Sequence, residues 1–287
     1  MLVNASMSIA RARVSATRII AVFETEPSVR ETSTPREPKN ADVVFDNVTF
    51  GYWGNEPVLR GVSVTIKQGR RVGVIGATGC GKSTLAALMA RLYDPDSGSV
   101  TLGGVDLREL SQESLREKVG IVFQESLLFS GSVADNLRFG DENADDAALL
   151  DAAEDAQAGE FLRSLSDGLG AEVAQRGRNF SGGQKQRLSI ARSLLHDPEV
   201  LILDDSASAL DAITDAKLRE ALRRRRNGQT LVIIAQRIGS IIDCDEIIVM
   251  DKGRITAAGS HRKLLEKSEL YRAIALSQLG DEVLRNG

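Results

Sequence analysis

From Val43 onward, short apolar runs alternate with polar positions in a way that predicts β-strands, in the segments VVFDNVTFGYW, PVLRGVSVTI and RRVGVIG. A stretch with the spacing of a helix, KSTLAALMARLY, follows directly behind a cluster of glycines. Later in the chain, the apolar strand patterns VLILDD, TLVIIAQ and EIIVMD alternate with the helical pattern DAKLREALRRRR, and a last helix is predicted around 261–279. Strands that alternate with helices predict an α/β fold.

The chain before the first predicted strand falls into two segments. Residues 1–26 predict a helix, although arginines interrupt its apolar pattern, and they lack the compact apolar run of a signal peptide. Residues 27–41 hold three of the six prolines among Ser, Thr and charged residues, which is typical of a linker. We therefore expect the opening helix to be separable from a domain over 42–287, in which the acid-rich stretch at about 125–180 forms a helical subdomain.

Composition narrows the class of protein. The 287 residues allow one large domain or two modest ones, and 42% hydrophobic with 26% charged residues exclude a disordered or collagenous chain. The net charge of −4 argues against a general nucleic-acid binder, so no nucleic-acid partner is expected. Cys80 and Cys244 lie far apart and give no disulfide framework, which favours a reducing compartment.

A glycine-rich loop carries the strongest local motif. The segment from Gly76 to Ser83, GATGCGKS, matches G-x-x-x-x-G-K-[ST], and it follows a predicted strand as the motif requires. Its glycines let backbone N–H groups turn inward around phosphates, and the helix that begins near Gly81 adds its positive end. Lys82 is then placed to reach the β- and γ-phosphates, and the Ser83 hydroxyl to ligate Mg2+.

Two carboxylates end the apolar strand VLILDD, at the edge where α/β sheets bind ligands. Asp204 is expected to hold Mg2+ through its water shell, and Asp205 stands where a base for water could stand. Cys80, inside the glycine loop, has two interpretations. Either the local positive potential lowers its pKa and makes it alkylatable, or it is a small residue that fits there.

The segment Phe180-Ser181-Gly182-Gly183-Gln184, followed by KQRLSIARSLL, resembles the signature sequence of ATP-binding-cassette (ABC) proteins. Other family elements line up in order over roughly 42–275. They are Tyr52 as the aromatic that stacks on adenine, with Trp53 as the alternative, Gln124 as the Q-loop glutamine, and Ser208-Ala209-Leu210-Asp211 as the D-loop. The resemblance implies an α/β P-loop NTPase core of ABC type, with an antiparallel β-subdomain and a helical subdomain.

The resemblance also implies an ATPase with ATP and Mg2+ as cofactors and a site completed only in a dimer. In the family, the signature points at the γ-phosphate of ATP held by the opposite subunit, so the residues implied to act in trans are Ser181, Gly182, Gly183, Gln184 and Asp211. The implied ATP-binding residues of the chain's own site are Tyr52, Gly76, Thr78, Gly79, Cys80, Gly81, Lys82, Ser83, Thr84 and Gln124. The implied metal ligands are Ser83, Gln124 and Asp204, and the implied catalytic residues are Lys82, Gln124, Asp205 and Gln236.

Two segments resemble the exporter branch of this family. AEVAQRGRNFSGGQ looks like its variant of the signature region, in which the residues before the signature touch the membrane domain. Residues 1–26 resemble the cytoplasmic end of the last transmembrane helix, running into the linker over 27–41. We therefore expect a soluble piece of a longer chain, at the cytoplasmic face of the cell membrane, with the transmembrane domain of that chain as one partner.

Two departures from the exporter pattern fall on the same chemical step. The family's Asp-Glu pair is Asp204-Asp205 here, and shortening the base by one C–C bond withdraws its carboxylate by roughly 1 to 1.5 Å. The family's switch histidine is replaced by Gln236, which can donate an amide hydrogen bond but cannot carry a proton. His196 and His261 are the histidines of the chain, and neither follows a strand at the switch position.

These departures predict the ATP-binding, weakly hydrolysing half of a heterodimeric exporter, whose signature serves the site of a non-identical partner subunit. An alternative is a homodimeric exporter ATPase that hydrolyses ATP with Asp205. An alternative from another class is a soluble ABC protein that senses nucleotide or acts in DNA repair or translation. This part of the chain does not indicate the substrate or the direction of transport.

Overall fold

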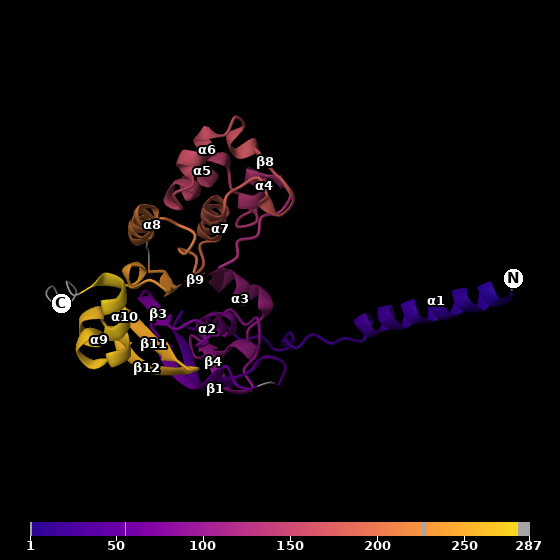
Figure 1. Cartoon of the computed structure of the whole chain (residues 1–287), viewed down its shortest axis with the longest axis horizontal. Helices are drawn as coiled ribbons and strands as arrows, with labels where there is room; N and C mark the ends of the chain where they lie inside the picture. Colours follow the sequence, from indigo (N-terminus) through magenta and orange to yellow (C-terminus); the bar gives the residue numbers. More distant parts are fainter. Residues whose placement is uncertain (1, 55, 226–227, 281–287) are drawn as a thin grey trace.

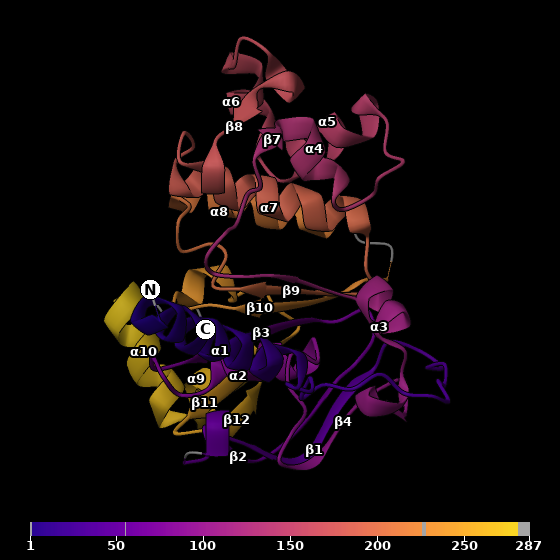
Figure 2. The same cartoon turned by 90° about the vertical axis from the view of Figure 1, so that its right-hand side faces the viewer.

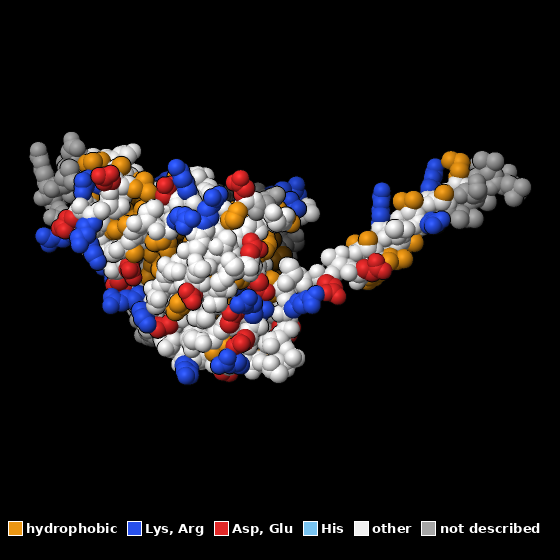
Figure 3. Space-filling view, turned by 90° about the horizontal axis from the view of Figure 1, so that it is seen from below, with side chains coloured by type: hydrophobic (Ala, Val, Ile, Leu, Met, Phe, Trp, Pro, Cys, Tyr) orange, Lys and Arg blue, Asp and Glu red, His pale blue; other side chains and the backbone are white. Residues whose placement is uncertain are grey.

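The structure of the protein is a computed structural model that describes residues 2–54, 56–225 and 228–280. Met1 and residues 281–287, which belong to the expected segments 1–26 and 42–287, lie outside the described residues. Helix α1 (Leu2–Phe23) projects away from the rest of the molecule (Figure 1). Its apolar side chains are interspersed with arginines on the surface (Figure 3), and Val14, Ile19, Ile20, Val22 and Phe23 are exposed. Of the helices within the described ranges, none combines the length and the apolar character that crossing a bilayer needs.

In the described part of the chain, a six-stranded sheet runs in the order β12-β11-β3-β10-β9-β6. Its strands are β3 (Arg71–Gly76), β6 (Val119–Val122), β9 (Val200–Asp204), β10 (Thr230–Ile234), β11 (Glu246–Asp251) and β12 (Arg254–Gly259). Neighbouring strands run parallel through β11, β3, β10, β9 and β6, whereas β12 pairs antiparallel with β11 at the edge. Because successive side chains on a strand point to opposite faces, Leu201 and Leu203 enter one hydrophobic core and Val200 and Ile202 enter a second.

The second core lies between this sheet, helix α2 (Lys82–Met89) and an antiparallel sheet of order β2-β1-β4-β5 (Figure 2). The strands of the antiparallel sheet are β1 (Val43–Phe50), β2 (Leu59–Ile66), β4 (Ser97–Leu102) and β5 (Val105–Asp106). In β1 the buried positions alternate through Val43 and Phe45 and then shift at a bulge. Gly98 has a φ of 81°, and a Cβ there would lie 2.4 Å from the carbonyl oxygen of Asp46, so this position needs glycine.

A helical part covers the opposite face of the central sheet and contributes to the first core (Figures 1 and 2). Its helices are α4 (Val133–Arg138), α5 (Asp146–Asp155), α6 (Gly159–Ser164), α7 (Gly182–His196) and α8 (Ala212–Arg225), with a short pair of strands, β7 (Gly131–Ser132) and β8 (Glu172–Val173). Helix α7 packs against α4 and α5, and Leu137, Leu149 and Leu188 from these three helices are buried in the same core. The expected helical subdomain at about 125–180 thus packs against the helix that follows the signature.

The end of the described chain forms two helices, α9 (His261–Lys267) and α10 (Glu269–Leu279). The expectation of one helix around 261–279 is wrong at Ser268, which ends α9 in an extended conformation. The Ser268 hydroxyl then accepts a hydrogen bond from the backbone N–H of Tyr271, 3.2 Å away, and so caps α10. Serine competes for backbone hydrogen bonds in this way, which makes it a frequent helix boundary.

Residues 27–41 lie along the 3₁₀ turn η2 (Leu107–Glu109) and helix α3 (Gln112–Lys118). The polar contacts are Gln112 N to Glu31 Oε1 (3.1 Å), Arg36 Nη1 to Glu109 Oε2 (2.6 Å) and Ser114 Oγ to Glu37 Oε2 (3.2 Å). The buried guanidinium of Arg91 also donates to the carbonyl oxygen of Arg30 over 2.9 Å. The linker is therefore attached to the domain along its length, while α1 projects from it.

Candidate functional site

The glycine loop joins β3 to α2 at the carboxyl edge of the central sheet. Lys82 Nζ donates hydrogen bonds to the carbonyl oxygens of Gly76 and Ala77, over 2.9 and 3.0 Å, so the loop closes around its own lysine. Gly81 has a φ of 105°, and a Cβ at Gly76 would lie 2.2 Å from the carbonyl oxygen of Met250. These positions need glycine, which explains the spacing of the motif in terms of close backbone packing.

Asp204 ends β9 directly beside this loop. The Ser83 hydroxyl donates to Asp204 Oδ1 over 3.0 Å, although the two residues are 121 positions apart in the chain. Asp204 is 5% exposed, and this burial raises its pKa, while the Ser83 hydrogen bond acts in the opposite direction and the charge of Asp205 adds to the rise. The charge of Lys82 also lowers this pKa, but by less than burial raises it, and a bound Mg2+ would favour the charged form of Asp204 further.

Asp205 follows Asp204 with a φ of 47°, in the left-handed region that few residues other than glycine adopt. Its Oδ2 accepts a hydrogen bond of 2.7 Å from Nε2 of Gln236, which follows β10. Burial raises the pKa of Asp205, and the hydrogen bond from Gln236 lowers it in part. The structure therefore brings the two unusual residues of the sequence into direct contact.

These residues line a cavity of about 340 Å³. The residues that line it are Val58, Thr78, Gly79, Gly81, Lys82, Ser83, Thr84, Gln124, Asp204, Asp205, Ile234 and Gln236. Hydroxyl, carboxylate and amide carbonyl oxygens are the ligands that Mg2+ prefers, so the donor set of Ser83, Asp204 and Gln124 fits that ion. Of the residues expected at the chain's own site, all except Tyr52, Gly76 and Cys80 line this cavity.

Tyr52 lies beside this cavity in a group of aromatic rings. Its ring makes edge contacts with those of Phe50 and Tyr93, at centroid distances of 5.0 and 5.2 Å. Its hydroxyl shares a hydrogen bond of 3.2 Å with that of Thr84, which lines the cavity. Trp53, the other candidate for stacking, is 90% exposed and has a φ of 56°. Tyr52 is thus fixed in place, whereas the Trp53 ring faces solvent.

The interpretation that the pKa of Cys80 is lowered is wrong. Cys80 is buried, and this burial raises the pKa of its thiol, while the charge of Lys82 lowers it by less. A Cβ at Gly76 would lie 2.7 Å from Cys80 Sγ, so the thiol fills the space behind the loop. The alternative, a small side chain that fits, agrees with this packing.

The signature segment lies at the start of α7. Ser181 and Gln184 form a reciprocal cap: Ser181 Oγ accepts from Gln184 N over 3.2 Å, and Gln184 Oε1 accepts from Ser181 N over 2.8 Å. A Cβ at Gly183 would lie 3.1 Å from the carbonyl oxygen of Ala209, so the signature and the D-loop are neighbours. The signature residues are absent from the lining of the 340 Å³ cavity within the described chain.

Asp211, at the end of the D-loop, precedes α8. Its Oδ1 accepts from the N–H groups of Ile213 and Thr214, over 3.0 and 2.9 Å, and its Oδ2 accepts from the Thr214 hydroxyl over 2.7 Å. These bonds hold the pKa of Asp211 below its ordinary value. In the single chain, this carboxylate therefore acts as a helix cap.

Sequence patterns did not reveal Gln278, which lies in α10. Its side chain hydrogen-bonds to the backbone on both sides of Arg237, next to Gln236. A lone glutamine in a terminal helix belongs to no motif, so only the folded chain places it near the site.

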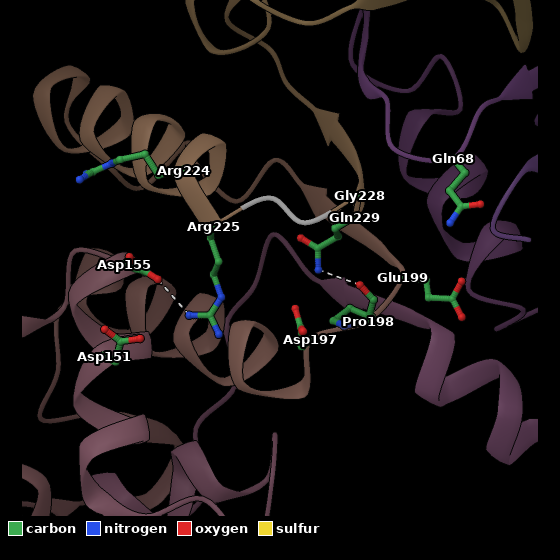
Figure 4. A pocket seen from close by; sticks show the side chains of 10 residues that line it. All are labelled: Gln68, Asp151, Asp155, Asp197, Pro198, Glu199, Arg224, Arg225, Gly228 and Gln229. Carbon is green, nitrogen blue, oxygen red and sulfur yellow. Dashed lines mark hydrogen bonds and ion pairs between the residues drawn. The ribbon is translucent and has the colours of Figure 1, made fainter.

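A further cavity, of about 670 Å³, lies at the other edge of the sheet (Figure 4). Glu199 and Gln229, on its wall, precede β9 and β10, so it sits at the amino ends of these strands. Its polar groups are partly engaged with one another, since Arg225 Nη1 pairs with Asp155 Oδ2 over 2.9 Å. Ligands of α/β sheets bind at the carboxyl ends, so the 340 Å³ cavity is the candidate site.

A phosphate loop, an acidic strand end and a donor set suited to Mg2+ define a P-loop nucleotide-binding domain. Residues 59–208 match the family described as "ABC transporter", and the chain belongs to this family. The expected family and fold class are thereby confirmed. The chain belongs to the ATPases of ABC transporters, and ABC ATPase domains bind ATP, generally with Mg2+.

Curated relatives extend this similarity. The chain is 42% identical over 261 residues to the beta-(1-->2)glucan export ATP-binding/permease protein NdvA of Rhodopseudomonas palustris, covering 90% of this chain and 44% of the relative. It is 41% identical over 245 residues to the mitochondrial iron-sulfur clusters transporter ATM1 of Chaetomium globosum, covering 84% of this chain and 40% of the relative.

A solved structure, of a bacterial Atm1-family ABC exporter with ATP bound, is 35% identical with a TM-score of 0.89. The match covers 94% of this chain and 48% of that chain. The chain thus spans less than half the length of these relatives.

Proposed function

We propose that this chain is the nucleotide-binding domain of an exporter and binds Mg-ATP in the 340 Å³ cavity, at the cytoplasmic face of a membrane. The relatives named above are export proteins, and the solved neighbour holds ATP, which supports a role of this kind. The remainder of such a protein would supply the transmembrane domain, attached through α1 and the linker. The observation that carries the ATP assignment is the contact of Ser83 with Asp204 beside Lys82.

The geometry gives each residue a role in binding. The N–H groups of the loop and of the start of α2 would surround the phosphates, and the Lys82 ammonium would exchange its loop carbonyls for β- and γ-phosphate oxygens. Ser83, Gln124 and Asp204 would hold Mg2+, which when bound neutralises charge on the phosphates. Tyr52 would stack on the adenine ring, since its own ring is held in place beside Thr84.

Hydrolysis at this site is proposed to be slow. The reaction is in-line attack of water on the γ-phosphate, and it needs a base within about 2.6 to 3.2 Å of the water. Asp205 is one C–C bond shorter than glutamate, and its Oδ2 already accepts a hydrogen bond from Gln236. The amide of Gln236 cannot take up a proton, so neither residue provides good general-base chemistry.

The signature would serve the site of a partner, which we propose to be a second, non-identical ABC subunit. Ser181 and the glycines after it leave N–H groups of the first turn of α7 available to an anion outside the chain. Asp211 would lie at the same interface, because the D-loop neighbours the signature. Transport would then be driven mainly by hydrolysis at the partner's site.

The test is nucleotide binding and turnover by the purified chain. We expect saturable Mg-ATP binding by calorimetry, with very slow phosphate release, and loss of binding in Lys82→Ala. Rapid phosphate release that Lys82→Ala abolishes would overturn the weak-hydrolysis proposal and favour a homodimeric ATPase. Failure of the unmodified chain to bind Mg-ATP would overturn the ATP assignment itself.

A further inference from the structure

The segment Gln236–Ser240 follows β10 and carries the side chain that contacts Asp205; we call it the switch segment. Within the switch segment, Gln236 is the residue that lines the cavity. The position of its side chain therefore depends on what holds the backbone of the segment in place. At the far end of the segment, the Ser240 hydroxyl donates to Asp215 Oδ2 of α8 over 3.0 Å. Next to Gln236 the support comes from Gln278 of α10, which is 42 positions further along the chain. Gln278 Nε2 donates to the carbonyl oxygen of Gln236 over 2.7 Å, and Gln278 Oε1 accepts from the N–H of Ile238 over 2.7 Å.

One carboxamide therefore makes two backbone hydrogen bonds that flank Arg237. The first fixes the peptide that follows Gln236, and the second fixes the peptide that precedes Ile238. Two bonds from one planar group restrict orientation as well as distance, which a single bond does not. The direction in which the Gln236 side chain leaves the backbone is thus set by Gln278.

The helix that carries Gln278 is firmly anchored. Tyr271 and Ala275 of α10 are fully buried in the first core, and the Tyr271 hydroxyl hydrogen-bonds to His261 Nδ1 over 2.7 Å. We call the two hydrogen bonds of Gln278 the clamp. Ile238 is also fully buried in this core, so the clamp joins two segments that are both packed in the core. Although Gln278 as a residue is exposed, both polar ends of its amide are engaged.

We infer that Gln278 is a positioning residue of the nucleotide site: through the switch segment, α10 sets the position of the Gln236 amide at the terminal phosphate of ATP. The inference rests on the proposed function of the 340 Å³ cavity, which Gln236 lines together with Lys82. Gln278 would not touch the nucleotide. Loss of the Gln278 hydrogen bonds would therefore weaken the affinity for ATP, which has a γ-phosphate, and leave the affinity for ADP unchanged.

The experiment compares Gln278→Met, which keeps the length of the side chain and removes both bonds, with Gln278→Glu, which keeps only the acceptor for Ile238. Ser277→Ala, an exposed neighbour in α10, is the matched control. Two quantities are measured in the full chain: the exchange rate of the Ile238 amide hydrogen by NMR, and the ratio of ATP to ADP affinity by calorimetry. Gln236→Ala, alone and combined with Gln278→Met, completes a double-mutant cycle.

We expect Gln278→Met to speed exchange at Ile238 and to lower the ATP-to-ADP affinity ratio about fivefold, the size that one lost hydrogen bond gives. Gln278→Glu should retain protection at Ile238 and lose less of the ratio, and Ser277→Ala should change neither. In the Gln236→Ala background, Gln278→Met should have no further effect on the ratio.

An unchanged exchange rate at Ile238 in Gln278→Met overturns the clamp. A lower ratio that persists in the Gln236→Ala background overturns its action through Gln236. If the unmodified chain binds no ATP, the proposed function fails, and the exchange rate still decides whether the clamp exists.

Discussion

Gln236 Nε2 donates a hydrogen bond of 2.7 Å to Asp205 Oδ2. These are the two residues that the resemblance to exporters implies to differ at the hydrolytic step. The departures are therefore in contact and not independent of each other. A shorter carboxylate and a neutral amide donor complement each other, because the amide stabilises the charged form of a carboxylate whose burial raises its pKa. A single substitution at either position leaves the other without this partner.

Reversing both departures should restore hydrolysis. In an assembled transporter whose partner site has been inactivated, we expect Asp205→Glu with Gln236→His to raise phosphate release from this chain's own site by about 10²-fold, the size of a well-placed general base. Each single substitution should give less than the pair, because it breaks the hydrogen bond without supplying its replacement. The measurement is steady-state phosphate release, with the same pair carrying Lys82→Ala as control. Equal rates in the pair and the unmodified protein would contradict the geometric argument.

The adenine should stack on Tyr52 and not on Trp53. Stacking of a base on an aromatic ring contributes about 1–3 kcal/mol, so Tyr52→Ala should weaken ATP binding at least about fivefold. Trp53→Ala should change it by less than about twofold, since that ring is exposed to solvent. Calorimetry with ATP and with inorganic tripolyphosphate separates stacking from damage to the loop. The opposite ranking of the two variants would move the stacking role to Trp53.

The main strands and the phosphate loop could be predicted from the sequence because their patterns are local. The apolar runs of β3, β9 and β10 are buried throughout and end at the motif residues. Strand β6 was not assigned from the sequence, because its four residues are too short for a periodic signal. The break at Ser268 was also missed, since an amphipathic pattern continues through it.

The residues of the site that belong to sequence motifs could be predicted, and the others could not. Lys82, Ser83 and Asp204 carry recognisable spacing, and the fold brings them together. The clamp of Gln278 depends on a pairing across 40 positions or more, and no local pattern encodes it. The sequence left two interpretations of Cys80 open because it indicates nearby charge but not burial, and burial is the larger effect on the pKa of this thiol.

Removing the charge of Asp204 should stabilise the nucleotide-free protein. Its pKa is raised above the ordinary 3.8, so its contribution to stability is fully present below pH 3.8 and is lost as the pH rises through the raised value. Asp204→Asn should therefore raise Tm at pH 7 by about 2 °C, equivalent to ~1 kcal/mol. This gain in Tm should become smaller as the pH falls toward 4, because Asp204 is then protonated and uncharged in the unmodified protein as well.

The same variant should lose the extra stabilisation that Mg2+ gives in the presence of ATP, because a carboxylate ligand is missing. Thermal melts with and without Mg-ATP measure both effects, and the exposed Asp151→Asn is the control. A lower Tm for nucleotide-free Asp204→Asn at pH 7 would show that the buried charge is not a net penalty.

Neither cysteine should react with iodoacetamide in the folded protein at pH 8. Burial raises the pKa of Cys244 to about 12, so its thiolate fraction at pH 8 is on the order of one in ten thousand. Burial also raises the pKa of Cys80, and both thiols should become reactive only in denaturant or as the pH rises. Mass spectrometry after labelling measures this. Full labelling of Cys80 in the folded protein at pH 8 would restore the interpretation of a reactive loop thiol.

Ser181 should matter for the partner's hydrolysis beyond its role as a helix cap, and the chain offers a matched control. Ser132 forms the same reciprocal cap at α4, where its hydroxyl accepts from Asp135 N over 3.0 Å. Loss of either hydroxyl should destabilise the chain by about 1 kcal/mol. If the signature completes the partner's site, Ser181→Ala should slow phosphate release by the assembled transporter about tenfold, the size of a 1.4 kcal/mol loss at the transition state, and Ser132→Ala should leave it unchanged.

The two variants should therefore be similar in Tm and different in phosphate release. This comparison removes helix fraying as an explanation, because both helices lose the same kind of cap. Equal phosphate release by Ser181→Ala and Ser132→Ala would mean that the first turn of α7 is only a structural cap, and the proposal that the signature acts on a partner's nucleotide would fail with it.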